Sequence, residues 1–177
     1  FASTADNSLA EEPRKRMKEL TKNDVTVRNL RPTDLEAVIA LDAKYIGRRR
    51  DEYFRVKLQQ TLLETGIKVS LAAEVDGSLV GFVLASVYYG EFGQTEQAAV
   101  LDTIGVHPSF GGRHVGAALM DQLRTNLFGL GVISLRTQVD WDDTRLVGFF
   151  QHEGSRPAPR LCLELGIDSP HRSPERE

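Results

Sequence analysis

Apolar residues alternate with polar ones in some stretches of the chain and recur every three or four residues in others. Alternation gives a strand one apolar face, whereas the longer spacing gives a helix one apolar face. Alternation predicts strands at 25–30, 69–75, 79–89, 98–106, 133–139 and 160–165, and the longer spacing predicts helices at 32–47, 51–65, 116–129 and 143–152. The resulting order, β-α-α-β-β-β-α-β-α-β, predicts an α/β (α+β) fold with a mixed sheet covered by helices.

Small and polar residues mark the turns between these elements. Asp76-Gly77 separates two strand patterns by two residues, which is typical of a tight hairpin. Thr33 or Asp34 is expected to cap the first helix. Cys162 lies in the alternating run of the last strand pattern, so we interpret it as a packing residue rather than a nucleophile.

Composition indicates one globular domain with two loose ends. Residues 1–23 and 168–177 lack sustained periodicity and are expected to be flexible, which leaves a domain at 24–167. The net charge of −3 argues against nucleic acid as a partner, and no apolar run approaches the roughly 20 residues that cross a membrane. One cysteine excludes an intrachain disulfide and suggests the cytoplasm, and the four histidines show no metal-ligand spacing.

The segment TIGVHPSFGGRHVGAALM, residues 103–120, carries the strongest chemical signal. A strand ends at His107-Pro108, a turn containing Gly111 and Gly112 follows, and a helix begins near Gly116. Such a turn gathers main-chain N–H groups at the positive end of a helix dipole, where phosphate groups bind readily. The segment therefore predicts a site for a phosphorylated cofactor.

The element order and the residues of this turn resemble the GNAT superfamily of N-acetyltransferases over residues 25–167. In that family the turn after the fourth strand commonly reads Gln/Arg-x-x-Gly-x-Gly/Ala, and its amides hold the pyrophosphate of acetyl-coenzyme A. Residues 111–116 take that place here, while a second register, Arg113-x-x-Gly116-x-Ala118, matches the letters but shifts the helix. Val106-x-Pro108 before the turn and Phe149-Phe150-x-x-x-Gly154 after the fifth strand strengthen the resemblance. The family sheet is twisted and mostly antiparallel.

The resemblance implies that acetyl-coenzyme A, without a metal, binds where the fourth and fifth strands splay apart. His114 has a Cβ where the family motif has glycine, so its backbone should avoid conformations that only glycine adopts. A phosphate contact and simple exposure both stay open for Arg113 and His114. The resemblance implies that Ile104, Gly105 and Val106 pair with the pantetheine arm as an added strand would. The full set of implied cofactor-binding residues is Ile104, Gly105, Val106, Gly111, Gly112, Arg113, His114, Val115, Gly116, Ala117, Asp143 and Phe150.

Acetyl transfer needs a neutral amine, a polarised thioester carbonyl and a proton for the departing thiolate. Many GNAT members protonate the thiolate with a Tyr in the helical pattern Asn-x-x-Ala-x-x-Leu-Tyr. The matching positions here are Asp143, Leu146, Phe149 and Phe150, so the final residue has no hydroxyl. The usual acid of the family is missing.

Asp102 is the candidate base, because an acidic residue within an apolar strand is costly unless it is paired or used. Alternation puts it on the face of Val100 and Ile104. The alternative is a structural carboxylate bonded to a neighbouring strand. Tyr88 and Tyr89 are further candidates as proton donors or pocket walls, with packing as their alternative.

The resemblance predicts an N-acetyltransferase that moves the acetyl group to a primary amine of a small molecule or peptide. A catalytically weak or inactive acyl-coenzyme A binder is the alternative. A nicotinamide-dependent oxidoreductase is disfavoured, because the glycine turn follows the fourth strand and no G-x-G-x-x-G is present. The open sheet edge, together with residues 161–163, suggests a homodimer.

Overall fold

The computed structural model describes residues 24–60, 69–89 and 96–167. The chain forms two compact units, Phe1–Gln138 and Val139–Glu177. The strands are β1 (Thr26–Asn29), β2 (Leu71–Val75), β3 (Ser78–Tyr89), β4 (Gln97–Val106) and β5 (Ser134–Arg136), and the helices are α1 (Leu35–Ile46), α2 (Asp51–Gln59), α3 (Val115–Gly129) and α4 (Thr144–His152), with 3₁₀ turns η2 (Pro32–Asp34) and η5 (Pro108–Phe110).

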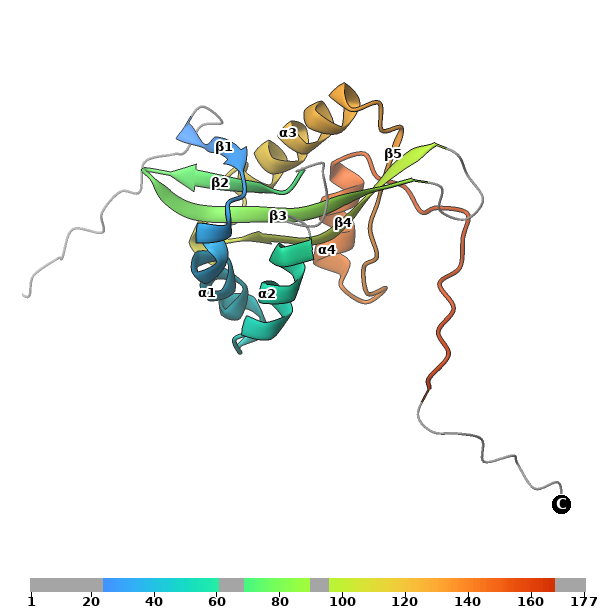
Figure 1. The fold of residues 1–177 in the computed structure, drawn as a ribbon, viewed down its shortest axis with the longest axis horizontal. Helices are drawn as coiled ribbons and strands as arrows, with labels where there is room; N and C mark the ends of the chain where they lie inside the picture. The colour runs from blue at the N-terminus through green and yellow to red at the C-terminus, as the bar shows by residue number, and fades with distance from the viewer. Residues whose placement is uncertain (1–23, 61–68, 90–95, 168–177) are drawn as a thin grey trace, which may run out of the picture. The chain divides into compact units, whose positions relative to one another are not determined.

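The first unit holds a five-stranded sheet in the order β1-β2-β3-β4-β5. Each of the first four strands runs antiparallel to its neighbour, and β5 runs parallel to β4 (Figure 1). Asp76 and Gly77 join β2 to β3 with φ values of 50° and 75°. Two consecutive left-handed residues match the right-handed twist of a hairpin, so the turn predicted from Asp76-Gly77 is confirmed.

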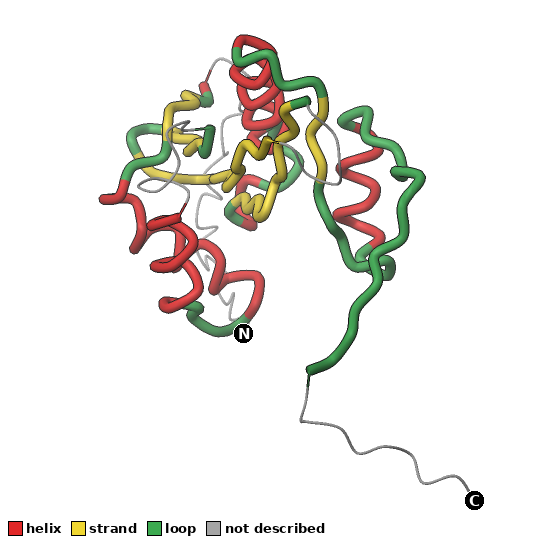
Figure 2. The backbone as a smooth tube through the Cα atoms, turned by 45° about the vertical axis from the view of Figure 1, so that its right-hand side comes forward, coloured by secondary structure: helices red, strands yellow, loops and turns green. Residues whose placement is uncertain are grey.

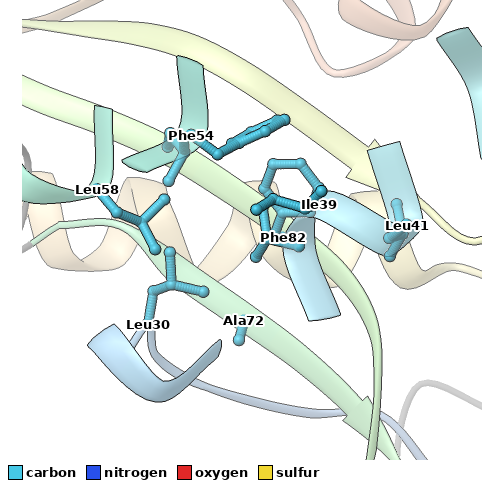
Figure 3. Packing of buried hydrophobic residues seen from close by; sticks show 9 residues of the cluster. Leu30, Ile39, Leu41, Phe54, Leu58, Ala72 and Phe82 are labelled. Atoms are coloured by element: carbon cyan, nitrogen blue, oxygen red, sulfur yellow. The ribbon is translucent and has the colours of Figure 1, made fainter. Parts of the chain in front are cut away.

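Helices cover both faces of this sheet. A Cβ on Gly105 would meet Leu41 of α1 and the ring of Phe82, whereas one on Gly81 would meet Val115 and Leu119 of α3. The face of α1 and α2 carries the main apolar cluster, shown with its side chains in Figure 3. Phe54 of α2 meets Phe82 of β3 edge to face, with ring centroids 5.8 Å apart.

A β-bulge interrupts the pairing of β3 with β4. Leu84 pairs with Thr103 and Ala85 pairs with Leu101, so Asp102 is an extra residue in β4. A bulge breaks the alternation of side chains between the two faces. Asp102 and Thr103 consequently both reach α2, where they contact Lys57 and Tyr53. The expectation that Asp102 shares a face with Ile104 is wrong, because Ile104 pairs with Val83 on the α3 face.

Charged groups organise the beginning of α1. The carboxylate of Asp34 accepts hydrogen bonds from the guanidinium of Arg28, at 2.7 and 2.9 Å, and from the N–H of Arg31 at 2.7 Å. It makes no hydrogen bond to an N–H of α1 itself, but its bond from Arg31 is a capping-box contact at Pro32, where the first helix was predicted to begin. The carboxylate thereby stabilises the η2 turn that precedes α1.

The predicted strand at 160–165 is not formed. Residues 160–167 follow an irregular path after α4 (Figure 2), and Leu161, Leu163 and Leu165 are each more than 80% exposed. Cys162 is also exposed, so its interpretation as a packing residue is wrong. An alternating pattern becomes a strand only when a neighbour accepts its hydrogen bonds, and this segment follows Pro157 and Pro159 without a paired strand. The other expected elements form, though the second helix was predicted to Thr65, which lies outside the described residues.

Candidate functional site

The edge of β4 that faces β5 is open over most of its length. β5 pairs only with Ala98–Val100 of β4, and the hydroxyl of Thr137 then donates to the carbonyl of Leu101 at 3.0 Å. Within the described residues, no strand pairs with this edge beyond Val100. The predicted splay between the fourth and fifth strands is therefore present.

The register of β3 and β4 shows which peptide groups this open edge presents. His107 donates its N–H to the carbonyl of Val80 at 2.7 Å, which makes His107 and Val80 a hydrogen-bonded pair. Hydrogen-bonded pairs alternate along an antiparallel ladder, so Gly105 also bonds to β3, whereas Ile104 and Val106 direct their peptide groups away from it. The expected participation of Gly105 through its main chain is not supported. Its missing side chain instead leaves space for Leu41 and Phe82.

The turn after β4 gathers N–H groups with no partner. The η5 turn uses the N–H groups of Phe110, Gly111 and Arg113, and the first hydrogen bond of α3 runs from the N–H of Ala118 to the carbonyl of His114. Within the described residues, the N–H groups of Gly112, His114, Val115, Gly116 and Ala117 make no well-formed hydrogen bond. Three of these groups form the first turn of α3, whose macrodipole adds positive potential there.

His114 takes a backbone conformation that glycine favours. Its φ of 61° and ψ of 3° lie in the left-handed region, as does Gly112 with φ of 70°. The expectation that its Cβ would keep His114 out of such a conformation is wrong. A residue with a Cβ can adopt the left-handed conformation at a cost on the order of 1–2 kcal/mol. The left-handed residue turns the chain sharply into α3. The side chain of His114 is exposed.

The bulge carries a polar cluster on the side of α2. Lys57 Nζ lies 2.9 Å from Asp102 Oδ1, and the side chains are 27% and 17% exposed. The Oδ2 atom of Asp102 is buried and has no hydrogen-bond partner in the part of the chain that the structure describes. Burial alone would lower the pKa of Lys57, but the hydrogen bond and charge of Asp102 raise that pKa above its ordinary value. The candidate base is thus already paired with a cation.

Two tyrosines from the helices reach the same strand. The hydroxyl of Tyr53 lies 3.1 Å from that of Thr103, and the hydroxyl of Tyr45 donates to the carbonyl of Val106 at the open edge. Arg50, which forms an ion pair with Asp42 at 2.6 Å, has its guanidinium carbon 4.6 Å from the ring centroid of Tyr53. These contacts hold the helix pair α1–α2 against β4 around the bulge.

Sequence reasoning missed the contact of Lys57 with Asp102. Lys57 follows Tyr53 by four residues, so both side chains lie on one face of α2. That spacing, next to an acid within an apolar strand, was the available signal. The bulge that turns Asp102 toward α2 has no signature in the sequence.

The second unit contains the remaining expected site residues. Asp143 caps α4, where its carboxylate accepts the N–H of Leu146 at 2.9 Å. Phe150 is buried, and its ring lies 5.3 Å from that of Phe149. Asp143 thus has a structural role within this unit, and Phe150 offers no polar atom.

The described residues contain neither a metal-ligating cluster nor a helix of membrane-spanning character. No group of three or more His, Cys, Asp or Glu residues is arranged to hold a metal ion in that part of the chain. None of the helices in the same residues combines the length and apolar character that a membrane span requires.

Comparison with known proteins gives this site a family context. The model of the acetyltransferase (GNAT) family matches residues 35–154. Among the solved structures with similar folds is an aminoglycoside N-acetyltransferase AAC(6')-Iy in complex with CoA, with a TM-score of 0.68 and 21% identity over 80% of this chain and 94% of that chain. A ribosomal-protein-alanine N-acetyltransferase from Brucella melitensis biovar Abortus 2308 has a TM-score of 0.65 and 24% identity over 80% of this chain and 98% of that chain. A transcriptional regulator from Bacillus halodurans C-125 has a TM-score of 0.69 and 16% identity over 80% of this chain and 99% of that chain.

Proposed function

Because the chain belongs to the GNAT acetyltransferase family, we propose that it transfers an acetyl group from acetyl-coenzyme A to a primary amine of a small molecule or peptide. The observation that carries the proposal is the set of five N–H groups without acceptors between Gly112 and Ala117. Unsatisfied N–H groups at the beginning of a helix fit a diphosphate in both charge and hydrogen bonding.

The open edge of β4 supports the binding of the rest of this co-substrate. The pantetheine arm contains two amides, and the peptide groups of Ile104 and Val106 face the open edge. An extended ligand can pair with such an edge as an added strand does. The diphosphate and the arm would thus be held by consecutive parts of one segment, β4 and the turn that follows it.

Acetyl-coenzyme A supplies an activated acyl group as a thioester. In the proposed reaction the nitrogen of the acceptor forms a bond to the acyl carbon, the carbon–sulfur bond breaks, and the products are an amide and free coenzyme A. The acceptor must first lose the proton of its ammonium group. Asp102 is the proposed acceptor of that proton, because its Oδ2 atom has no hydrogen-bond partner among the described residues.

The named relatives act on amines of very different size. One is an aminoglycoside acetyltransferase and another acetylates a ribosomal protein. The proposal for this chain is therefore limited to their shared chemistry, a primary amine. The helix pair α1–α2 lies on the sheet face that Asp102 shares, and we place the acceptor on that side.

Turnover of acetyl-coenzyme A, measured as free thiol against a panel of peptides, polyamines and amino sugars, tests the proposed activity. We expect at least one amine to release thiol in equal amount to the acetylated product, identified by mass spectrometry. Thiol release that does not depend on any amine would contradict the proposal.

The phosphate site has its own test by calorimetry with coenzyme A. Gly116→Val adds a β-branched side chain at the second residue of α3, beside the free N–H groups, and is expected to weaken binding by more than tenfold. Gly129→Val is the matched control, because it changes a glycine at the other end of α3 where an added Cβ meets nothing within 4 Å. Equal affinity for the two variants would show that the diphosphate binds elsewhere.

A catalytically weak or inactive acyl-coenzyme A binder is the second candidate function. It is favoured by Phe150, which cannot donate a proton, and by the pairing of Asp102 with Lys57. This candidate predicts tight binding of coenzyme A together with no amine-dependent thiol release from the whole panel.

A further inference from the structure

The ion pair between α2 and the bulge leaves one carboxylate oxygen unused. Lys57 binds Asp102 through Oδ1 at 2.9 Å, while Oδ2 is buried without a partner. A buried carboxylate oxygen without a hydrogen bond costs stability, commonly about 1–3 kcal/mol. A donor supplied by a ligand would remove that cost.

The position of this oxygen relates it to the proposed reaction. β5 stops pairing with β4 at Val100, and the bulge places Asp102 two residues further along. The peptide groups of Ile104, which face the open edge, follow after two more residues. Asp102 therefore follows the point where the splay begins, and the bulge turns its carboxylate to the face that α2 covers.

Few other ionisable groups act on this pair in the described residues. The phenols of Tyr53 on α2 and Tyr88 on β3 are close enough to act on the charge of Lys57. Arg50 stacks on Tyr53, but Asp42 balances its charge. The ion pair that these described residues show at Asp102 is the one between its carboxylate and the ammonium of Lys57.

These two charges have opposite effects on an incoming ammonium group. A carboxylate alone binds an ammonium and stabilises its charged form, which cannot attack a thioester. A second cation beside the carboxylate destabilises the charged form and lowers the pKa of the acceptor amine. Lys57 is placed to supply that second charge without blocking Oδ2.

We propose that Lys57 is a positioning residue. It holds Oδ1 of Asp102 so that Oδ2 receives the acceptor's proton, and its charge favours the neutral form of the acceptor amine. This inference rests on the proposed acetyl transfer. The acceptor ammonium gives one proton to Oδ2 and becomes the nucleophile. After its attack the nitrogen loses a second proton, which the departing thiolate takes up as the carbon–sulfur bond breaks, and the proton on Oδ2 passes to solvent. Each turnover of a charged amine therefore releases one proton overall.

The test compares Lys57→Met, which keeps the length of the side chain without its charge, with Lys57→Arg. For an amine that the wild type acetylates, kcat and KM are measured from about pH 6 to pH 10. Lys57→Met is expected to lower KM for the charged amine, because the carboxylate is no longer neutralised. It is also expected to lower kcat about tenfold at neutral pH and to move the acidic limb of the kcat profile upward by about one unit. Lys57→Arg should keep both constants within about threefold of the wild type.

A second acceptor, whose amine is already neutral at pH 7, separates this role from a structural one. The loss of kcat in Lys57→Met should nearly vanish with it, because no proton has to be removed. Lys44→Met, on the exposed last turn of α1, is the matched control and should leave both acceptors unaffected. Calorimetry with coenzyme A and a melting curve establish that Lys57→Met is folded.

The possible outcomes separate the two proposals. If the wild type is active but Lys57→Met loses kcat equally at all pH values and with both acceptors, the proposed role of Lys57 is overturned. The proposed acetyl transfer is unaffected by that result. A Lys57→Met variant that no longer folds is replaced by Lys57→Gln, to which the same criteria apply. A wild type that releases no thiol with any amine overturns the proposed function, and the role of Lys57 falls with it.

Discussion

Asp34 shows how a single carboxylate can connect three elements. It accepts hydrogen bonds from Arg28 of β1 and from the N–H of Arg31, while Arg28 also binds Glu74 of β2 at 2.6 Å. The hydrogen bond from Arg28 lowers the pKa of Asp34 most. Burial opposes it with the next largest effect, and the bond from Arg31 adds a smaller lowering, so the pKa lies below its ordinary value. The ionised form is therefore the one that stabilises the folded chain.

The pKa of Asp34 gives a prediction for the pH dependence of stability. A carboxylate with a lowered folded pKa contributes stability above its unfolded value, near 3.8, and loses it as the pH falls through the folded value. Asp34→Asn should cost on the order of 2 kcal/mol at pH 7. Urea denaturation should show this cost shrinking below about pH 3.8. A cost that stays constant down to pH 2 would mean that the charge of Asp34 contributes nothing.

Asp102 and Phe150 allow the proton-transfer roles to be tested separately. We expect Asp102→Asn to lower turnover at neutral pH, because an amide cannot accept the proton of the acceptor. We expect Phe150→Tyr to leave turnover unchanged, because the proposed reaction uses no hydroxyl at that position. The measurement is kcat with free thiol as readout from about pH 6 to pH 9. Equal activity of Asp102→Asn over this range would remove Asp102 as the base, and a gain in Phe150→Tyr would show that protonation of the thiolate limits the rate.

At the scale of elements, local sequence was sufficient to predict those strands, helices and turns that are determined by their own residues. The hairpin at Asp76-Gly77 and the glycine turn before α3 have characteristic residues, and both were predicted. The bulge at Asp102 was not, because it depends on the pairing of β3 with β4 rather than on the residue itself. The contact with Lys57 was missed for the same reason. The family membership predicted from the turn is confirmed, whereas the roles of individual site residues stay predictions.

Two glycines in different elements should respond to alanine in opposite directions. Gly148 lies inside α4, where an added Cβ meets nothing within 4 Å, so Gly148→Ala should stabilise the protein by about 0.5–1 kcal/mol. Gly77 has φ of 75° in the hairpin, so Gly77→Ala should destabilise by about 1 kcal/mol although space is also available there. Thermal denaturation of both variants measures this contrast. Effects of the same sign would contradict the backbone argument.

At the scale of the whole molecule, most buried apolar side chains lie in the first unit, whereas the leucines that follow α4 are exposed. Leu119 of α3 is fully buried, whereas Leu163 is 89% exposed. Both residues are leucines in periodic apolar patterns, one in a predicted helix and the other in a predicted strand. The pattern after α4 failed as a predictor because burial requires a partner surface, which periodicity does not supply.

The same two leucines give the last prediction. Leu119→Ala should cost about 2–5 kcal/mol, because it removes buried methyl groups and leaves a cavity, whereas Leu163→Ala should change stability by less than about 0.5 kcal/mol. Urea denaturation at two protein concentrations, together with light scattering, measures both. The homodimer expected from residues 161–163 would change this result, because a segment buried between two copies would make Leu163→Ala costly and the cost dependent on protein concentration. A large loss at Leu163 that does not depend on concentration would instead mean that the segment packs within its own chain, as the alternating sequence first suggested.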